Sequence, residues 1–156
     1  YSRCEKQEWA EAAECGKNGA KNDFVDDDGY TAAHWSAQSD NGEVTELILK
    51  NQNNQIERRN NNWYTPLTLA FQYGRNQVAE KILNIGAANP IADLLLSNQN
   101  FKTGLDILAK KNLLTENNIQ NDLQYLKDAK LTDDSDFKKN IGNFIGFCRN
   151  DFKIDI

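Results

Sequence analysis

Residues 26–49 read "DDDGYTAAHWSAQSDNGEVTELIL" and residues 60–83 read "NNNWYTPLTLAFQYGRNQVAEKIL". The two stretches align without a gap at a constant offset of 34 residues, since 65 − 31 = 34 and 83 − 49 = 34. The chain therefore contains an internal repeat, and a repeat of this length indicates a stack of similar structural units. Identical residues in register include Tyr30 and Tyr64, Thr31 and Thr65, Val44 and Val78, Ile48 and Ile82, and Leu49 and Leu83.

Each unit has the same predicted order of elements. A polar Asp/Asn-rich turn comes first, and Thr31 or Thr65 then stands where the N-cap of a helix is expected. Pro66 follows Thr65 directly, at the first helical position, where a missing N–H does no harm. A short helix, a second polar turn and a second helix with apolar residues at helical spacing complete the unit. Because so small a helix pair cannot bury its own apolar face, it must stack on a neighbouring copy, as in a solenoid.

The stretches "DGYTAAHWSA" and "YTPLTLAF" resemble the T-P-L-H-x-A signature of ankyrin repeats, whose period is about 33 residues. The resemblance covers two repeats well, at about 26–59 and 60–92. It implies an all-α ankyrin-repeat solenoid of helix-turn-helix units with β-hairpin turns. The second repeat departs from the pattern twice, with Trp63 where the family prefers the turn glycine and Thr68 in place of His34. Because Trp63 cannot adopt a positive φ cheaply, we expect that hairpin tip to be distorted or packed against another group.

The flanks match less well. Residues 4–17 are predicted to form the second helix of a degenerate N-terminal unit, and the sequence after Asn89 a shortened third helix pair, so that the repeat domain spans 1–112. Residues 113–156 are predicted to form two C-terminal capping helices that cover the end of the stack. A separate binding surface is the alternative for these helices. Their apolar faces would carry Ile119, Leu123 and Leu126 on one and Phe137, Ile141, Phe144, Ile145 and Cys148 on the other.

Composition limits the functional classes. The chain has 156 residues, a net charge of −5 and a pI of about 4.9, which disfavours binding to nucleic acid or to anionic membranes. It contains no run of at least about 18 apolar residues that could span a bilayer. The three cysteines lack CxxC spacing, which favours reduced thiols and a cytoplasmic location. Because the chain starts at Tyr and has no Met, we expect it to be a piece of a longer protein.

The acidic run Asp26–Asp28 before Gly29 superficially resembles a calcium loop. If Gly29 occupied position six of an EF-hand loop, Phe24 would stand at position one and Trp35 at position twelve. Neither side chain can ligate calcium. The run is therefore predicted to be a solvated hairpin tip that closes on the glycine.

His34 is the only histidine in the chain, so no second His exists to build a zinc site. No nucleophile or metalloprotease motif surrounds it, and the chain is predicted to be neither an enzyme nor a cofactor- or metal-binding protein. The ankyrin resemblance implies instead that His34 ties neighbouring hairpins together by hydrogen bonds. Trp35 and Leu69 share a repeat position and are predicted to be core residues. The pair Arg58–Arg59 is interpreted as solvated rather than as an anion site.

The ankyrin resemblance further implies a non-catalytic module that binds a partner protein across a concave groove of hairpin tips and first helices. Tyrosine and tryptophan in this set are typical interface anchors, and the aspartates favour a partner with basic residues. No small-molecule substrate is expected. The residues that the resemblance places in the groove are Asp27, Asp28, Tyr30, Gln38, Ser39, Asn61, Asn62, Trp63, Tyr64, Gln72 and Tyr73.

Two other functions remain open at this point. The chain can be the interaction domain of a larger protein, such as a bacterial effector delivered into a host cell. It can also be an architectural subunit of a large assembly that docks through its C-terminal helices. The sequence does not choose between these and a free-standing scaffold, because a fold does not by itself fix a function.

Overall fold

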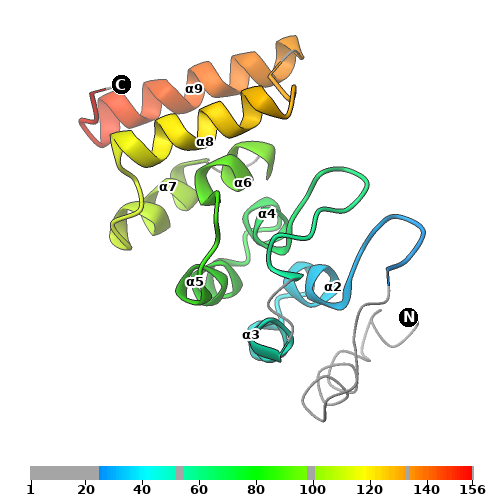
Figure 1. Cartoon of the computed structure of the whole chain (residues 1–156). Helices are drawn as coiled ribbons and strands as arrows, with labels where there is room; N and C mark the ends of the chain where they lie inside the picture. Colours follow the sequence, from blue (N-terminus) through cyan, green and yellow to red (C-terminus); the bar gives the residue numbers. More distant parts are fainter. Residues whose placement is uncertain (1–24, 52–54, 98–100, 133, 156) are drawn as a thin grey trace. The chain divides into compact units, whose positions relative to one another are not determined.

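The computed structural model describes residues 25–51, 55–97, 101–132 and 134–155. Within these ranges the chain is helical and has no β-strand (Figure 1). Contacts divide the chain into two compact units, Tyr1–Ala88 and Asn89–Ile156. The predicted N-terminal helix at 4–17 lies outside the described residues. The predicted division at residue 112 stays a prediction.

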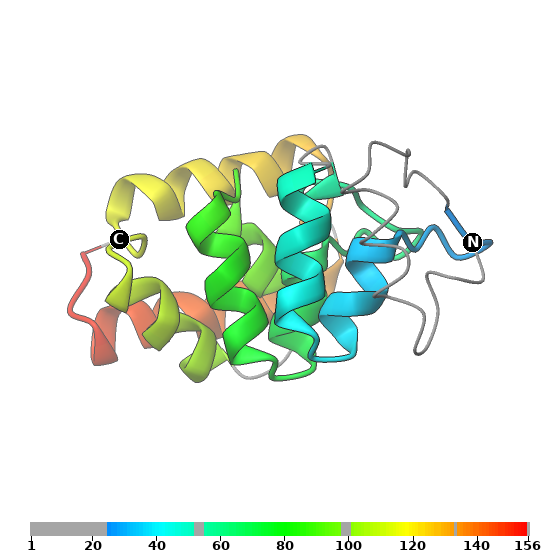
Figure 2. The same cartoon turned by 90° about the horizontal axis from the view of Figure 1, so that it is seen from below.

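The first unit contains the two repeats, each as a helix pair. The first repeat contributes α2 (Ala32–Gln38) and α3 (Gly42–Asn51), and the second contributes α4 (Pro66–Gln72) and α5 (Asn76–Ile85). Within each repeat the two helices pack together, α2 on α3 and α4 on α5. Between repeats, α2 packs on α4 and α3 packs on α5, so like helices lie side by side (Figure 2). The stacking predicted from the repeat is therefore confirmed.

Small side chains allow the first helices to approach closely. Ala33, Ala37 and Ala70 are completely buried, together with Leu67 from α4. The second helices supply larger apolar groups to the same core, such as Ile48 of α3 and Ile82 of α5. Fully burying one such side chain stabilises the fold by about 1.5–3 kcal/mol. The buried side chains of both helices in each repeat therefore stabilise the stack.

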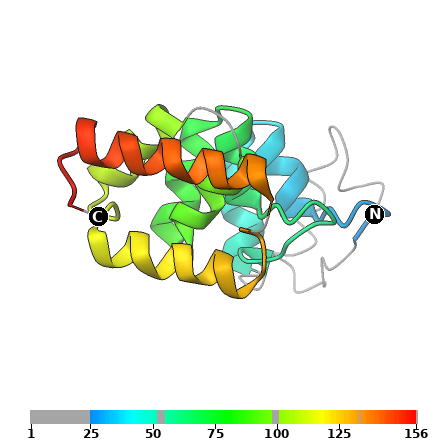
Figure 3. The ribbon, with the colours of Figure 1, turned by 90° about the horizontal axis from the view of Figure 1, so that it is seen from above.

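The second unit contains the remaining four helices. They are α6 (Pro90–Ser97), α7 (Phe101–Lys110), α8 (Glu116–Asp128) and α9 (Ser135–Asp151). Helices α7, α8 and α9 all contact α6, which is apolar along almost its whole length. Figure 3 shows α8 (yellow) and α9 (orange to red) as long helices that run in opposite directions. The two predicted C-terminal amphipathic helices are thus present. Of the apolar residues predicted for their inner faces, four are buried: Ile119, Leu126, Phe144 and Cys148.

A buried carboxylate joins α8 to the start of α6. The Oδ2 atom of Asp122 accepts hydrogen bonds from the main-chain N–H groups of Ile91, at 2.8 Å, and Ala92, at 3.0 Å. Its Oδ1 accepts from the side-chain amide of Asn89 at 3.0 Å. These N–H groups belong to the first turn of α6, where no intrahelical acceptor exists. Asp122 therefore caps a helix that lies 30 residues or more before it in the sequence.

Candidate functional site

The first helix of each repeat begins with a capping box. The Thr31 hydroxyl accepts from the N–H of His34 at 3.4 Å, and the Thr31 N–H donates back to His34 Nδ1 at 3.0 Å. In the second repeat the Thr65 hydroxyl accepts from the N–H of Thr68 at 3.1 Å, and the Thr65 N–H donates to Thr68 Oγ1 at 3.2 Å. The predicted N-caps at both threonines are confirmed, as is the position of Pro66 at the helix start.

His34 also bonds to the neighbouring repeat. Its Nε2 lies 2.7 Å from the carbonyl oxygen of Tyr64. Because Nδ1 accepts from Thr31, Nε2 must carry the ring proton and donate it to Tyr64. Burial lowers the pKa of His34 to about 4, so the ring is neutral at pH 7. The predicted tie between hairpins is confirmed, whereas Thr68 at the equivalent position bonds to Thr65 within its own repeat.

The hairpin tips have matching hydrogen bonds. We call Asp26–Tyr30 the first tip and residues 60–64 the second tip. In the first tip, Asp26 Oδ1 accepts from the N–H groups of Asp28 at 3.0 Å and Tyr30 at 2.9 Å. In the second, Asn60 Oδ1 accepts from Asn62 at 2.9 Å and Tyr64 at 3.0 Å. Both tips need a side-chain oxygen at the first residue of the turn to accept these hydrogen bonds. Asp and Asn each supply one.

The second oxygen of Asp26 has a further role that Asn60 lacks. Asp26 Oδ2 accepts from the indole N–H of Trp35 at 3.2 Å. The equivalent of Trp35 in the second repeat is Leu69, which cannot donate, and the buried Nδ2 of Asn60 has no hydrogen-bond partner among the described residues. Leu69 is a core residue as predicted, but Trp35 is only half-buried, so its assignment to the core was wrong. Its polar N–H keeps it at the edge of the core, against Asp26.

The two tips are joined directly. The Asn61 main-chain N–H donates to the Asp28 carbonyl at 3.0 Å, and the Asn61 side-chain amide donates to the Asp27 carbonyl at 2.9 Å. The tips approach closely at Gly29, whose φ is +82° and where a Cβ would lie 2.9 Å from Asn61 N. Only glycine satisfies both conditions without strain. The tips therefore form one continuous surface.

Trp63 occupies the position of Gly29 in the second repeat, and it also has a positive φ, of 70°. The Arg59 guanidinium lies 5.3 Å from the centre of the Trp63 ring, and Arg59 Nη1 donates to the Trp63 carbonyl at 2.7 Å. The indole is nevertheless 40% exposed. The second tip is thus packed against another group, which is one of the two outcomes predicted, and it keeps the hydrogen bonds of the first tip. Arg59, interpreted from the sequence as solvated, instead supports Trp63.

Tyr30 lies at the centre of the predicted groove residues. Its ring packs on Trp35, with centroids 4.7 Å apart, and on His34, at 5.6 Å. Burial raises the pKa of Tyr30, and the nearby Tyr73 phenol, Asp28 carboxylate and Tyr64 phenol raise it further.

Two glutamines occupy equivalent positions at the ends of α2 and α4. Both Gln38 and Gln72 are half-buried, and in each the Oε1 atom is buried without a hydrogen-bond donor from the described residues. The main-chain carbonyl of Gln38, by contrast, accepts from Arg75 Nε at 3.0 Å. Arg75 was absent from the predicted set, although its position directly after the second-repeat turn "YG" is visible in the sequence.

None of the eleven predicted groove residues is fully buried, and all lie in the first unit. Asp27, Asp28 and Asn61 are brought together by hydrogen bonds, and Tyr30, Tyr64 and Tyr73 by proximity of their phenols. Among the described residues, no hydrogen bond or ring contact joins the side chain of Ser39 or Asn62 to the others. The part that all eleven residues play in binding stays a prediction. The exposed members are Asp27, Asp28, Ser39, Asn61, Asn62, Trp63 and Tyr73, and the half-buried members are Tyr30, Gln38, Tyr64 and Gln72.

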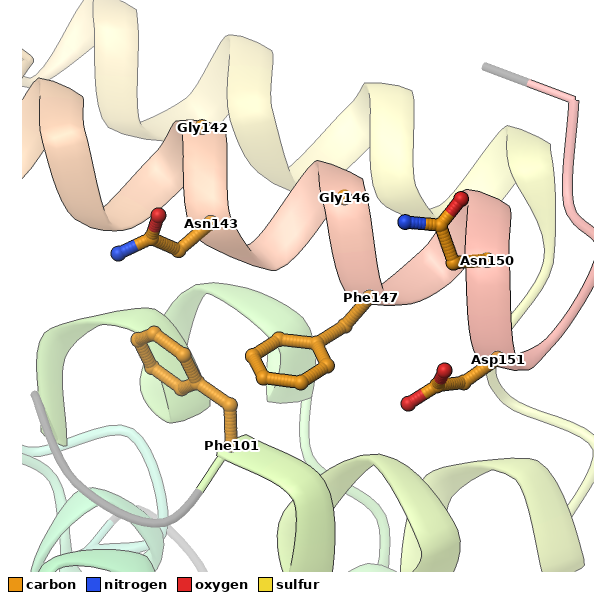
Figure 4. A pocket seen from close by; sticks show the side chains of 7 residues that line it. All are labelled: Phe101, Gly142, Asn143, Gly146, Phe147, Asn150 and Asp151. Carbon is orange, nitrogen blue, oxygen red and sulfur yellow. The ribbon is translucent and has the colours of Figure 1, made fainter.

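The second unit has a cleft of about 470 Å³ beside α9 (Figure 4). The rings of Phe101 and Phe147 point into it, and Gly142 and Gly146 leave α9 without side chains along one wall. The lining holds Asn143, Asn150 and Asp151 as its polar side chains. The cleft has no arrangement of acid, base and nucleophile of the kind that catalysis requires.

Among the described residues, no group of His, Cys, Asp and Glu side chains is placed to hold a metal ion. No helix within those ranges is long and apolar enough to cross a membrane. Cys148 is buried in α9, and burial raises the pKa of its thiol to about 11. A thiol with so high a pKa is protonated at pH 7 and is a poor nucleophile.

The comparison with protein families agrees with this architecture. A family model described as ankyrin repeats, in three copies, matches residues 10–93, which is more than half of the chain. No curated protein matches the chain closely enough to count as a relative. Ankyrin repeats generally mediate interactions between proteins, and the family is typically non-catalytic. The repeated helix pairs, the two capping boxes and the family match together show that this chain belongs to the ankyrin-repeat family.

Proposed function

We propose that this chain is a non-catalytic interaction module that binds a partner protein across the two hairpin tips and the first helices α2 and α4. The observation that carries the proposal is the pair of hydrogen bonds from Asn61 to the Asp28 and Asp27 carbonyls. They hold two exposed tips in a fixed arrangement before any partner arrives. Preorganisation of this kind lowers the entropy that association loses.

The side chains on this surface suit a protein ligand. Trp63 and Tyr73 are 40% and 45% exposed, and aromatic residues of this kind contribute most of the binding free energy at many interfaces. Asp27 and Asp28 add negative potential, which favours a partner with basic residues over nucleic acid or an anionic membrane. The proposal includes no small-molecule substrate. We include a cytoplasmic location in the proposal. The proposal applies equally to a chain that acts alone and to one that is a domain of a longer protein.

The test uses partners captured by cross-linking to the full chain and identified by mass spectrometry. Tyr64→Ala and Trp63→Gly are then introduced together. Tyr64→Ala keeps the main-chain carbonyl that accepts from His34. Trp63→Gly introduces the residue that the first tip has at the equivalent position, Gly29. We expect affinity for the identified partner to fall at least about 100-fold, as for the loss of two interface anchors, with no loss of thermal stability.

The matched control is Phe147→Ala, which removes an equally exposed aromatic ring from α9 in the second unit. If the double variant keeps full affinity while Phe147→Ala loses it, the partner binds the C-terminal helices and the proposal is wrong. That result would support the architectural role, in which the chain docks through α9.

A further inference from the structure

Charges of opposite sign lie on the first tip and directly before the second tip. In the first tip, the Asp27 and Asp28 side chains are exposed and form no ion pair with the described residues. The second tip is preceded by Arg58, which is exposed, and by Arg59. Glu57 reduces this positive charge by one, and its Oε2 accepts from the main-chain N–H of Ala88 at 2.8 Å. A uniformly acidic ligand is therefore repelled by the first tip, and a uniformly basic one by the second.

Trp63 marks the second tip as a binding anchor. A non-glycine residue at φ 70° stores strain, on the order of 1–3 kcal/mol. The Trp63 side chain at this strained position is 40% exposed and contributes little to the core. Arg59 lies over the ring and donates to the Trp63 carbonyl, so that the ring and the positive charge are presented together. Strain that supports an exposed aromatic ring is typical of a binding position.

The hydrogen bonds between the tips set a spacing in the ligand. They hold Asn61 against Asp27 and Asp28, and Arg58 lies three residues before Asn61 in the sequence. A chain of three residues spans at most about 10–11 Å. Because an extended ligand rises about 3.2–3.4 Å per residue, it covers the distance from the aspartates to Arg58 in about three residues.

We propose that the tips bind an extended segment of the partner that carries two opposite charges about three residues apart. A basic side chain lies against Asp27 and Asp28, and an acidic side chain lies against Arg58, which precedes the tip that carries Trp63. This inference rests on the proposed function and adds the chemistry and spacing of the ligand. It also makes the expected basic partner more specific, because a run of basic residues alone would not fit.

The probe is a display library of random linear peptides, selected on the full 156-residue chain and counter-selected on the Tyr64→Ala, Trp63→Gly variant. We expect the enriched peptides to share a basic and an acidic residue at the stated spacing. The double variant Asp27→Lys, Asp28→Lys should weaken their binding about tenfold or more. Reversing the basic residue of the peptide to Glu should restore binding to that variant, and this rescue is a result that a merely structural role of the aspartates would not produce.

The control variant Asp106→Lys, Asp155→Lys makes the same change of net charge at exposed sites in the second unit and should alter binding by less than about twofold. Enriched peptides without the charge pair, or a loss of binding without rescue, would overturn the inference and leave the proposed function standing. If the library yields no peptide that distinguishes the full chain from the Tyr64→Ala, Trp63→Gly variant, both the inference and the proposed surface are wrong.

Discussion

The imidazole Nε2 of His34 lies 2.7 Å from the main-chain carbonyl oxygen of Tyr64, 30 residues later in the sequence. The same ring accepts the N–H of Thr31 at the start of its own helix. One neutral side chain thus caps α2 and ties the first repeat to the second. Protonation of Nδ1 would remove the acceptor that Thr31 requires.

His34 predicts a loss of stability at mildly acidic pH. Its folded-state pKa of about 4 lies below its ordinary value of 6.5, so the stabilisation is present above pH 6.5 and is lost as the pH falls towards 4. The shift corresponds to about 3 kcal/mol in total, of which about 2 kcal/mol is lost at pH 5. Urea unfolding at pH 7 and pH 5 measures this loss.

The control for this prediction is His34→Thr, which copies the capping box of the second repeat but has no group to reach Tyr64. We expect this variant to be about 1–3 kcal/mol less stable at pH 7 and to lose most of the pH dependence between 5 and 7. A variant with the same pH dependence as the original chain would show that other groups cause it.

Gly29→Ala is predicted to destabilise the first unit by at least about 2 kcal/mol. The added Cβ would meet the main chain of Asn61 and Asn60, which cannot move without separating the tips. Gly74→Ala is the matched control, because its φ is also positive, +69°, but nothing lies within 4 Å of the added atom. It should cost only about 1 kcal/mol. If thermal unfolding shows equal losses of stability in Gly29→Ala and Gly74→Ala, the close approach of the tips adds nothing to the cost of the added Cβ.

Gln38→Leu and Gln72→Leu are each predicted to stabilise the free chain by about 1 kcal/mol. Each change removes a buried Oε1 atom that has no hydrogen-bond donor from the described residues, and keeps a side chain of similar size. Gln77→Leu, at an exposed position of α5, should change stability by less than about 0.5 kcal/mol. Thermal unfolding of the three variants measures these changes in stability. If Gln38→Leu is destabilised, the Gln38 side-chain amide has a hydrogen-bond partner in solution.

Asp122→Ala is predicted to destabilise the second unit by about 3 kcal/mol, because the Ile91 and Ala92 N–H groups lose a buried, charged acceptor. Hydrogen exchange of these two amides should accelerate more than that of amides in the middle of α8. Asp128→Ala, on the exposed face of the same helix, is the control and should leave both exchange rates unchanged. Unaltered protection of Ile91 in Asp122→Ala would refute the role of this carboxylate as a cap.

Several elements could be predicted from the sequence because the interactions that define them are local. Each capping box joins residues three apart, and each tip is closed by an Asp or Asn side chain that bonds two and four residues ahead. The period of 34 residues then indicated that these units stack, since one helix pair cannot bury its apolar face. Trp63 at a glycine position also identified an unusual tip before its geometry was known.

Other features depended on which residues the fold brings together. The repeat position that Trp35 shares with Leu69 predicts a core residue, but the Asp26 carboxylate holds the Trp35 indole N–H at the edge of the core. In the second repeat Asn60 stands at the position of Asp26, and Leu69 has no N–H to donate to it. Arg59 was read as a solvated cation because the sequence does not show that its guanidinium lies over Trp63.

By itself, the sequence determined the repeat, the helix starts, the turn chemistry and the family, because these arise from short-range hydrogen bonds and from periodic apolar faces. Only the tertiary structure decided that Asp122 caps α6, that Asn61 joins the two tips, and that Gln38 and Gln72 each bury an oxygen with no hydrogen-bond donor among the described residues. These relationships join groups about 30 residues apart, or depend on how neighbouring helices exclude water. Packing geometry, rather than local preference, selects the partners in such contacts.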